Sequence, residues 1–110
     1  MLGNVRQAKA DFRRDDRFPV NYYAAGDHGR LGRLVVKIVD LSSTGVMIDG
    51  KAGIERGDKI LLHLSDAIKV EALCIWTWHQ HAGLQFDQAM SSSDLISTMQ
   101  TIMPDKFDGE

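Results

Sequence analysis

IKVEALCIWTW, residues 68–78, shows the clearest period of two in the chain. Successive side chains of a β-strand point to opposite faces, so this alternation predicts one long strand. One face would carry Ile68, Val70, Ala72, Cys74, Trp76 and Trp78, and the other Lys69, Glu71, Leu73, Ile75, Thr77 and His79. The two tryptophans could stack on bases, but since both fall on the more apolar face, we expect them to pack in the core or at the end of a barrel.

Further strand segments lie on both sides of this stretch. They are residues 18–25, 31–41, 46–49, 60–64 and 83–86, which are short and rich in branched or aromatic side chains. Glycine-containing turns separate them, and the first of these turns is expected at residues 26–29. Residues 31–41 carry branched side chains on both faces, which predicts a strand that is covered on both sides.

A helix is expected after the last strand. Residues 91–93 are serines that can cap a helix, and Ser91 with Asp94 resembles a capping box. One helical stripe follows, made of Leu95, Met99, Ile102 and Met103, and Pro104 ends it. Six short strands and one helix predict an all-β fold with a C-terminal helix, specifically a small six-stranded antiparallel β-barrel.

The length and composition fit one folded domain. The chain has 110 residues, of which 44% are hydrophobic and 25% charged. We expect a flexible polar arm at residues 1–17, the barrel with its helix at residues 18–103, and an acidic tail at residues 104–110. No apolar run is long enough for membrane insertion, and no secretory signal begins the sequence, so we expect a cytoplasmic protein.

The charge distribution favours a small anionic ligand. The formal net charge of −2 argues against binding long nucleic acids, which usually requires a basic excess. The first 17 residues differ from the rest, because they contain five basic and three acidic residues, which gives a local charge of +2. The basic residues are Arg6, Lys9, Arg13, Arg14 and Arg17, and the acidic ones are Asp11, Asp15 and Asp16.

Three of these arginines form a candidate ligand site. Arg13, Arg14 and Arg17 lie within five residues, just before the first strand. A guanidinium is a planar fork of donors that matches a phosphate, or the O6 and N7 edge of guanine, in two parallel hydrogen bonds. The structural alternative is a solvated charge cluster, partly neutralised by Asp15 and Asp16.

A second candidate follows the strand at residues 31–41. Asp40 and Ser42 are two apart, so the carboxylate and the hydroxyl would lie side by side. Gly45 would let a ligand or the backbone approach closely. An aspartate can accept hydrogen bonds from guanine N1–H and its amino group. The structural alternative is a serine turn that closes a hairpin, with Gly45 at a positive φ.

Other reactive side chains give weaker patterns. His79 and His81 could share a metal in a small hydrolase, but no acidic or thiolate partner has a suitable spacing. Cys74, the single cysteine, falls on the apolar face and is interpreted as a buried core residue. Because no catalytic triad, carboxylate pair or phosphate loop accompanies them, we expect a protein without enzymatic activity, metal or cofactor.

The two candidate motifs together resemble the PilZ domain family. Arg13-x-x-x-Arg17 precedes a strand, and Asp40-x-Ser42-x-x-Gly45 precedes another, with the resemblance running from about Phe12 to Phe86 and extending over the helix. It implies a bacterial receptor for the second messenger cyclic di-GMP. Arg13 and Arg17 would contact phosphates and guanine edges, while Asp40, Ser42 and Gly45 would contact guanine from the barrel surface. Arg14 occupies a variable position of the first motif.

The resemblance also implies a mechanism and a rival. We expect the arm to order over the nucleotide like a clasp and so to change a surface that a downstream protein partner contacts. The family often binds the ligand as an intercalated dimer. The rival is a PilZ-like protein-interaction adaptor that does not use the nucleotide, and a titration with cyclic di-GMP separates the two.

Overall fold

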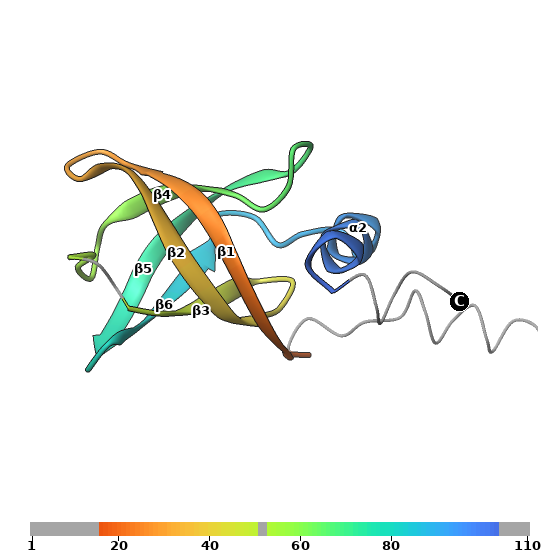
Figure 1. Ribbon diagram of the computed structural model, residues 1–110, viewed down its shortest axis with the longest axis horizontal. Helices are drawn as coiled ribbons and strands as arrows, with labels where there is room; N and C mark the ends of the chain where they lie inside the picture. The colour runs from red at the N-terminus through yellow and green to blue at the C-terminus, as the bar shows by residue number, and fades with distance from the viewer. Residues whose placement is uncertain (1–15, 51–52, 104–110) are drawn as a thin grey trace, which may run out of the picture.

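The computed structural model describes residues 16–50 and 53–103 and contains six strands and one helix (Figure 1). These elements are β1 (Phe18–His28), β2 (Gly32–Leu41), β3 (Gly45–Asp49), β4 (Lys59–His63), β5 (Lys69–Trp78), β6 (His81–Phe86) and α2 (Ser92–Ile102). The strands form a closed barrel in the order β1-β2-β3-β6-β5-β4, and every neighbouring pair is antiparallel. The predicted six-stranded antiparallel barrel with a C-terminal helix is therefore confirmed. The proposed arm and tail lie outside the described residues, except for Asp16 and Arg17.

The barrel interior holds the hydrophobic core. Branched side chains that alternate along the strands point inward, and Ile38, Ile48 and Leu62 are fully buried. Cys74 is also buried, as its place on the apolar face predicts. Side chains that stack from all six strands remove apolar surface from water, which is the main favourable contribution to folding.

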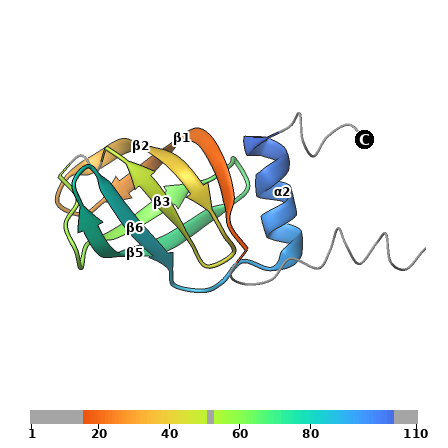
Figure 2. The same cartoon turned by 90° about the horizontal axis from the view of Figure 1, so that it is seen from below.

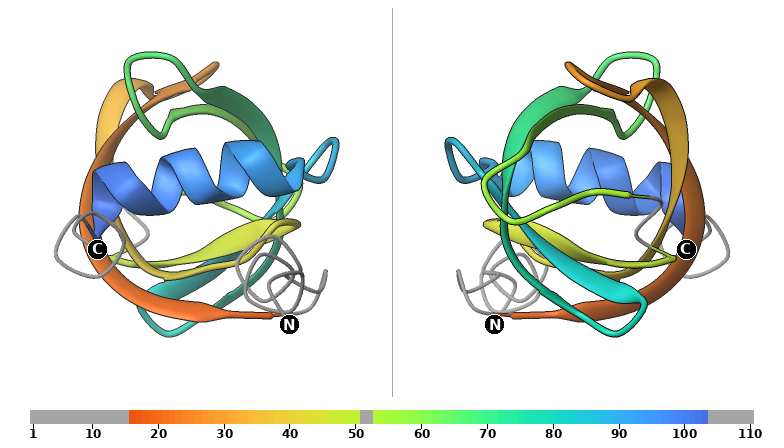
Figure 3. Two further views of the ribbon diagram at one scale, coloured as in Figure 1. Left: turned by 90° about the vertical axis from the view of Figure 1, so that its right-hand side faces the viewer. Right: turned by 90° about the vertical axis from the view of Figure 1, so that its left-hand side faces the viewer.

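The helix α2 closes one mouth of the barrel, and both views in Figure 3 show it crossing that end. Leu95 and Met99 of its predicted stripe are buried in the core. Ser91 is the N-cap, and its Oγ accepts a hydrogen bond from the backbone N of Asp94 at 3.1 Å, which confirms the expected cap. No helix among residues 16–50 and 53–103 combines the length and the apolar character that crossing a bilayer would require.

Two expectations about the first hairpin are wrong. The turn was expected at residues 26–29, but β1 continues to His28 and pairs with both β2 and β4 over this stretch. Gly26 suits that position because a Cβ there would lie 3.0 Å from Cγ2 of Ile60, so the glycine permits close packing of β1 on β4. In β2 the outer face is not covered at Val35, which is 60% exposed, while Lys37 and Val39 further along that face are half-buried.

The expected burial of the two tryptophans is also wrong. β5 contains a β-bulge, because its register with β6 shifts between Cys74 and Trp76. A bulge adds one residue to a strand and changes which face the following side chains occupy. Both tryptophans therefore lie on the outer wall, where Trp76 is 37% and Trp78 is 69% exposed.

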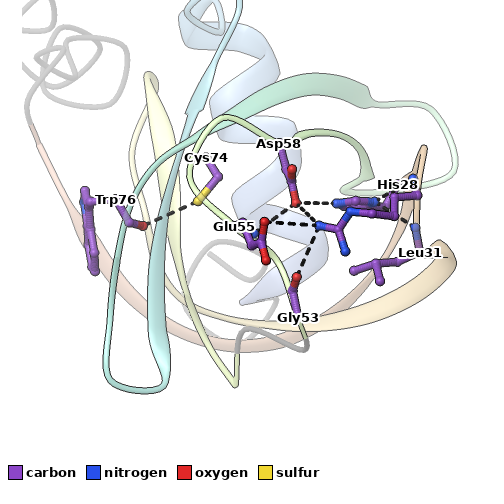
Figure 4. Close-up of polar contacts among 8 residues, drawn as sticks. His28, Leu31, Gly53, Glu55, Asp58, Cys74 and Trp76 are labelled. Carbon is purple, nitrogen blue, oxygen red and sulfur yellow. Dashed lines mark hydrogen bonds and ion pairs between the residues drawn. The ribbon is translucent and has the colours of Figure 1, made fainter.

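A network of hydrogen bonds joins the β1–β2 turn to the loop before β4 (Figure 4). Nδ1 of His28 accepts hydrogen bonds from the backbone N atoms of Arg30 and Leu31, at 3.0 and 2.9 Å. Nε2 of His28 therefore carries the proton, and this N–H donates a hydrogen bond to Oδ2 of Asp58 at 2.7 Å. The same Oδ2 accepts from Nη2 of Arg30 at 2.8 Å and from the backbone N of Glu55 at 2.9 Å. We call these five residues the His28 cluster.

Hydrogen bonds lower the pKa of two aspartates at this end of the barrel, Asp58 and Asp27. The backbone hydrogen bond from Glu55, followed by the hydrogen bond from His28, lowers the pKa of Asp58 below the ordinary aspartate value. A smaller group lies nearby on the outer wall, where Asp27 accepts from His63 at 2.8 Å and from Arg33 at 2.7 Å. These two hydrogen bonds, that from His63 first, lower the pKa of Asp27. Both carboxylates are thus held in the charged form.

Candidate functional site

The candidate site is a hollow of about 140 Å³ on the outer wall of the barrel. It lies over β3, β6 and β5, which run side by side in Figure 2. Its lining consists of Arg17, Ser42, Thr44, Gly45, Val46, Met47, Ile75, Trp76, Gly83, Leu84 and Gln85. Three of the six residues singled out in the sequence, namely Arg17, Ser42 and Gly45, therefore line one hollow.

Arg17 lies at the rim of the hollow and reaches across to β2. Pro19 in β1 pairs with Asp40 in β2, which brings the residue that precedes β1 close to that carboxylate. Nη1 of Arg17 donates to Oδ2 of Asp40 at 3.1 Å, although the two residues are 23 positions apart. The Arg17 side chain is 69% exposed, so the ion pair itself contributes little stability. A guanidinium has five N–H donors, and this contact uses one of them.

The turn between β2 and β3 forms another part of the rim. Oγ of Ser42 accepts from the backbone N atoms of Thr44 and Gly45, both at 3.2 Å, and the backbone N of Ser42 donates to the carbonyl O of Gly45 at 2.9 Å. Ser42 is only 6% exposed. The serine turn that was the structural alternative is therefore present, and Ser42 shapes the turn that borders the hollow.

Of the reasons expected for Gly45, close approach of the backbone is confirmed and a positive φ is wrong. Its φ is not positive, in contrast to four other described glycines. A Cβ at this position would instead collide with the backbone carbonyl O of Leu84, because β3 lies very close to β6 here. The absent side chain thus permits close strand packing at the floor of the hollow.

Trp76 forms an aromatic wall of the hollow, although the sequence interpretation preferred core or barrel-end packing to base stacking for this residue. A Cβ at Gly83 would collide with Nε1 and Cε2 of the Trp76 indole, so the ring lies directly over the glycine. Gly83 in β6 pairs with Trp76 in β5 on one side and with Met47 in β3 on the other. The signal available in the sequence was the glycine itself, since a glycine within a strand often marks a close approach.

Of the remaining predicted site residues, only Asp40 has a described position. Arg13 and Arg14 lie outside the described residues, so their contacts with the hollow stay a prediction. Asp40 does not line the hollow but reaches it through Arg17. Together, the described part of the site offers a positively charged fork, a carboxylate and a partly exposed aromatic ring around one hollow. This combination can bind a planar, anionic ligand.

The two histidines considered for a metal lie at the hairpin between β5 and β6. His79 has a φ of 55° and contacts the Trp78 ring edge to face, while Nε2 of His81 lies 3.6 Å from Oδ1 of Asp49. Within residues 16–50 and 53–103, no three histidine, cysteine or acidic side chains gather in an arrangement that could hold a metal ion.

A larger hollow, of about 430 Å³, lies between β5 and the start of α2. None of the six candidate ligand-binding residues is among those that line it. Three carboxylates, from Glu71, Asp87 and Asp94, face one lysine, Lys69. Because that excess of negative charge would repel a phosphate, the smaller hollow is the better candidate for an anionic ligand.

Comparison with known proteins gives one family. The family model described as PilZ domain matches residues 11–102. The matched range covers both candidate motifs, all six strands and α2. The search of the curated proteins found no match.

Proposed function

The chain belongs to the PilZ domain family, and from this premise we propose that it binds cyclic di-GMP at the hollow bordered by Arg17, Asp40, the Ser42–Gly45 turn and Trp76. Family membership implies an adaptor that binds this second messenger rather than an enzyme. The observation that carries the proposal is the contact of Arg17 with Asp40 at 3.1 Å, beside a hollow that the Ser42–Gly45 turn also lines.

Each group suits a different part of the nucleotide. The free donors of Arg17 match a phosphate or the O6 and N7 edge of guanine. The Asp40 carboxylate can accept hydrogen bonds from guanine N1–H and from the guanine amino group. Arg17 would then contact both Asp40 and the ligand. The exposed face of Trp76 offers a stacking surface, and base–aromatic stacking contributes about 1 to 3 kcal/mol per base. Gly45 lets β3 lie close to β6, and Gly83 lets the Trp76 ring lie over β6, so both glycines shape the hollow that would hold the base.

The first motif supplies the remaining charge. Arg13 and Arg14 precede Arg17, and we expect Arg13 to contact phosphate or guanine and Arg14 to contribute less. Ordering about five residues over the ligand would cost roughly 5 to 10 kcal/mol of backbone entropy. A bidentate arginine contact to guanine returns about 1 to 3 kcal/mol of discrimination. Several contacts are therefore needed together for a micromolar affinity, which corresponds to about −8 kcal/mol.

Isothermal titration calorimetry with cyclic di-GMP tests the proposal. We expect a micromolar or tighter dissociation constant, and the titration also gives the number of ligand molecules bound. Arg17→Ala should weaken binding at least about tenfold, which is about 1.4 kcal/mol. Arg33→Ala is the matched control, because Arg33 is similarly exposed and also pairs with an aspartate, but it lies outside the hollow. Unchanged affinity in Arg17→Ala, or an equal loss in both variants, would contradict the assignment.

The proposed adaptor mechanism needs a second measurement. Binding should order the segment before Arg17 and alter the surface that a downstream protein contacts. Hydrogen exchange with and without nucleotide reports this ordering, and we expect slower exchange in residues 5–17 when nucleotide is bound. Equal exchange in both states argues against the clasp. Absence of any heat of binding in the wild type leaves the rival function, an adaptor that does not use the nucleotide.

A further inference from the structure

One side of β5 lacks a neighbouring strand near the hairpin with β6. β4 pairs with β5 only from Lys69 to Leu73 of β5. At the next residue, Cys74, the loop before β4 makes two further backbone hydrogen bonds: the Cys74 N donates to the Asp58 O, and the Gly57 N donates to the Cys74 O. Within the described part of the chain, no strand pairs with residues 75–78 on that side. This end of the barrel points away from α2 (Figure 1). Residues 75–78 are therefore an edge, which we call the β5 edge.

The hairpin turn determines which backbone groups face outward at the β5 edge. Trp78 pairs with His81 across a two-residue turn, and such a pair is hydrogen bonded within the hairpin. Antiparallel pairs alternate between hydrogen-bonded and non-hydrogen-bonded, so Thr77 and Ala82 form a non-hydrogen-bonded pair. The backbone N–H and C=O of Thr77 consequently point away from β6, toward the open side.

The side chains on the β5 edge are apolar and exposed. Ile75 is 43% and Trp78 is 69% exposed, and residues 75–78 contain no charged side chain. Proteins usually protect an open edge from pairing by placing lysine, proline, an inward charge or a β-bulge on it. Residues 75–78 contain no lysine, proline or charge, and the bulge lies at the start of the edge, before the regular strand at residues 76–78. The β5 edge therefore has the properties of a strand that pairs with another strand.

We propose that the β5 edge pairs with the same edge of a second copy of this chain. A two-fold axis through Thr77 would let the two Thr77 residues exchange both N–H to O=C hydrogen bonds. Trp78 of each copy would then lie opposite Trp76 of the other, and aromatic cross-strand pairs are among those that stabilise sheets. The two hairpins would join into one antiparallel sheet of four strands. Because the paired segment carries no charge, its self-association meets no like-charge repulsion within the strand pair.

The exposed area sets the strength of this contact. Aromatic side chains bury on the order of 150 to 250 Å² each when fully covered. With their partial exposure, Ile75, Trp76 and Trp78 together offer on the order of 300 to 400 Å² per copy. That is about half of the roughly 800 Å² per partner in a stable complex, so we expect a weak dimer that forms only at high protein concentration.

Analytical ultracentrifugation of the full chain without nucleotide tests the proposal. We expect a reversible monomer–dimer equilibrium that is visible between about 10 μM and 1 mM. Trp78→Glu should raise the dimer dissociation constant at least about tenfold. Tyr23→Glu is the matched control, because Tyr23 is 65% exposed on β1, away from the β5 edge, and its variant should leave the equilibrium unchanged. A monomer at about 1 mM, or equal weakening by both variants, overturns the proposal.

Amide hydrogen exchange at two protein concentrations distinguishes strand pairing from simple contact between tryptophans. The Thr77 amide should exchange more slowly as the dimer forms. The Trp78 amide bonds within the hairpin and should exchange at the same rate at both concentrations. A Thr77 exchange rate that does not change while the dimer is present would show that another surface makes the contact. Neither measurement depends on whether the chain binds cyclic di-GMP.

Discussion

Two of the arginine–aspartate contacts, those of Arg30 and Arg17, lie near opposite ends of β1, and they differ in how many other groups share the carboxylate. Arg30 donates to Asp58 at 2.8 Å, where Oδ2 also accepts from His28 and from the backbone of Glu55. Arg17 donates to Asp40 at 3.1 Å, with a guanidinium that is largely exposed. The same pair of residue types thus has a structural role in the His28 cluster and is available to a ligand at the hollow.

The difference has a physical basis. A buried polar group is costly unless it is hydrogen bonded, so the nearly buried His28 ring needs its partners on both nitrogens. An exposed ion pair gains little from its contact and loses little when the contact is exchanged for a phosphate. Substitutions in the His28 cluster should therefore change stability, and substitutions at the hollow should change affinity.

The largest expected effect is that of His28→Ala. The substitution leaves a cavity and removes the acceptor for two backbone N–H groups of the β1–β2 turn. We expect a loss of about 2 to 4 kcal/mol in the free energy of unfolding. Urea denaturation measures it, and the folded variant should bind cyclic di-GMP with wild-type affinity. A loss below about 1 kcal/mol would mean that the His28 cluster does not hold the two loops together.

Gly45→Ala should have the next largest effect. The added methyl meets the backbone carbonyl of Leu84, which cannot move without separating β3 from β6. Overpacking of this kind costs about 1 to 3 kcal/mol of stability. Gly29→Ala is the control, since nothing lies within 4 Å of a Cβ at Gly29 and its φ is not positive. Equal stability of the two variants would contradict the close strand contact at the floor of the hollow.

Trp76→Ala should weaken nucleotide binding with little loss of stability. The indole is partly exposed, and loss of one stacked base costs about 1 to 3 kcal/mol, or roughly five- to 150-fold in affinity. Gly83→Ala should weaken binding less, because its methyl displaces the ring without removing it. Calorimetric titration with cyclic di-GMP measures the affinity of both variants and so tests the expected order. If Gly83→Ala bound as tightly as wild type, the position of the ring over the glycine would be irrelevant to the ligand.

The smallest effect is a loss of stability in acid. The pKa of Asp58 is lowered in the folded protein, so this carboxylate contributes stability that is present above the ordinary value of 3.8. That contribution is lost as the pH falls through the lower folded pKa. Urea midpoints between about pH 6 and pH 3 should therefore fall, and they should fall less steeply in Asp58→Asn. Asp66→Asn, at an exposed position in the β4–β5 loop, should follow the wild type.

The sequence predicted those parts of the fold that depend on local pattern. Alternation of side chains located the strands, and the serine before α2 located its cap. The period of two failed at the bulge between Cys74 and Trp76, because one extra residue shifts the alternation and only the partner strand reveals it. The turn expected at residues 26–29 failed because Gly26 serves close packing against Ile60 rather than chain reversal.

Prediction of the site was limited in the same way. The resemblance pointed to Arg17, Asp40, Ser42 and Gly45, which the structure brings to one region. Trp76 was assigned to the core or the barrel end instead of to the site, because its orientation depends on the bulge in β5 and on Gly83, its partner in the neighbouring strand β6. The His28 cluster could not be predicted, since His28 and Asp58 are 30 residues apart and meet only through strand pairing.

The most direct test is an NMR titration of the labelled protein with cyclic di-GMP. We expect changes in the amide signals of Arg17, Asp40 and residues 42–45 and in the indole N–H of Trp76, with the His28 and Asp58 amides unchanged. That pattern would place the ligand at the exposed arginine–aspartate pair. Signals that shift mainly around His28 and Asp58, or no shift at saturating nucleotide, would contradict the account.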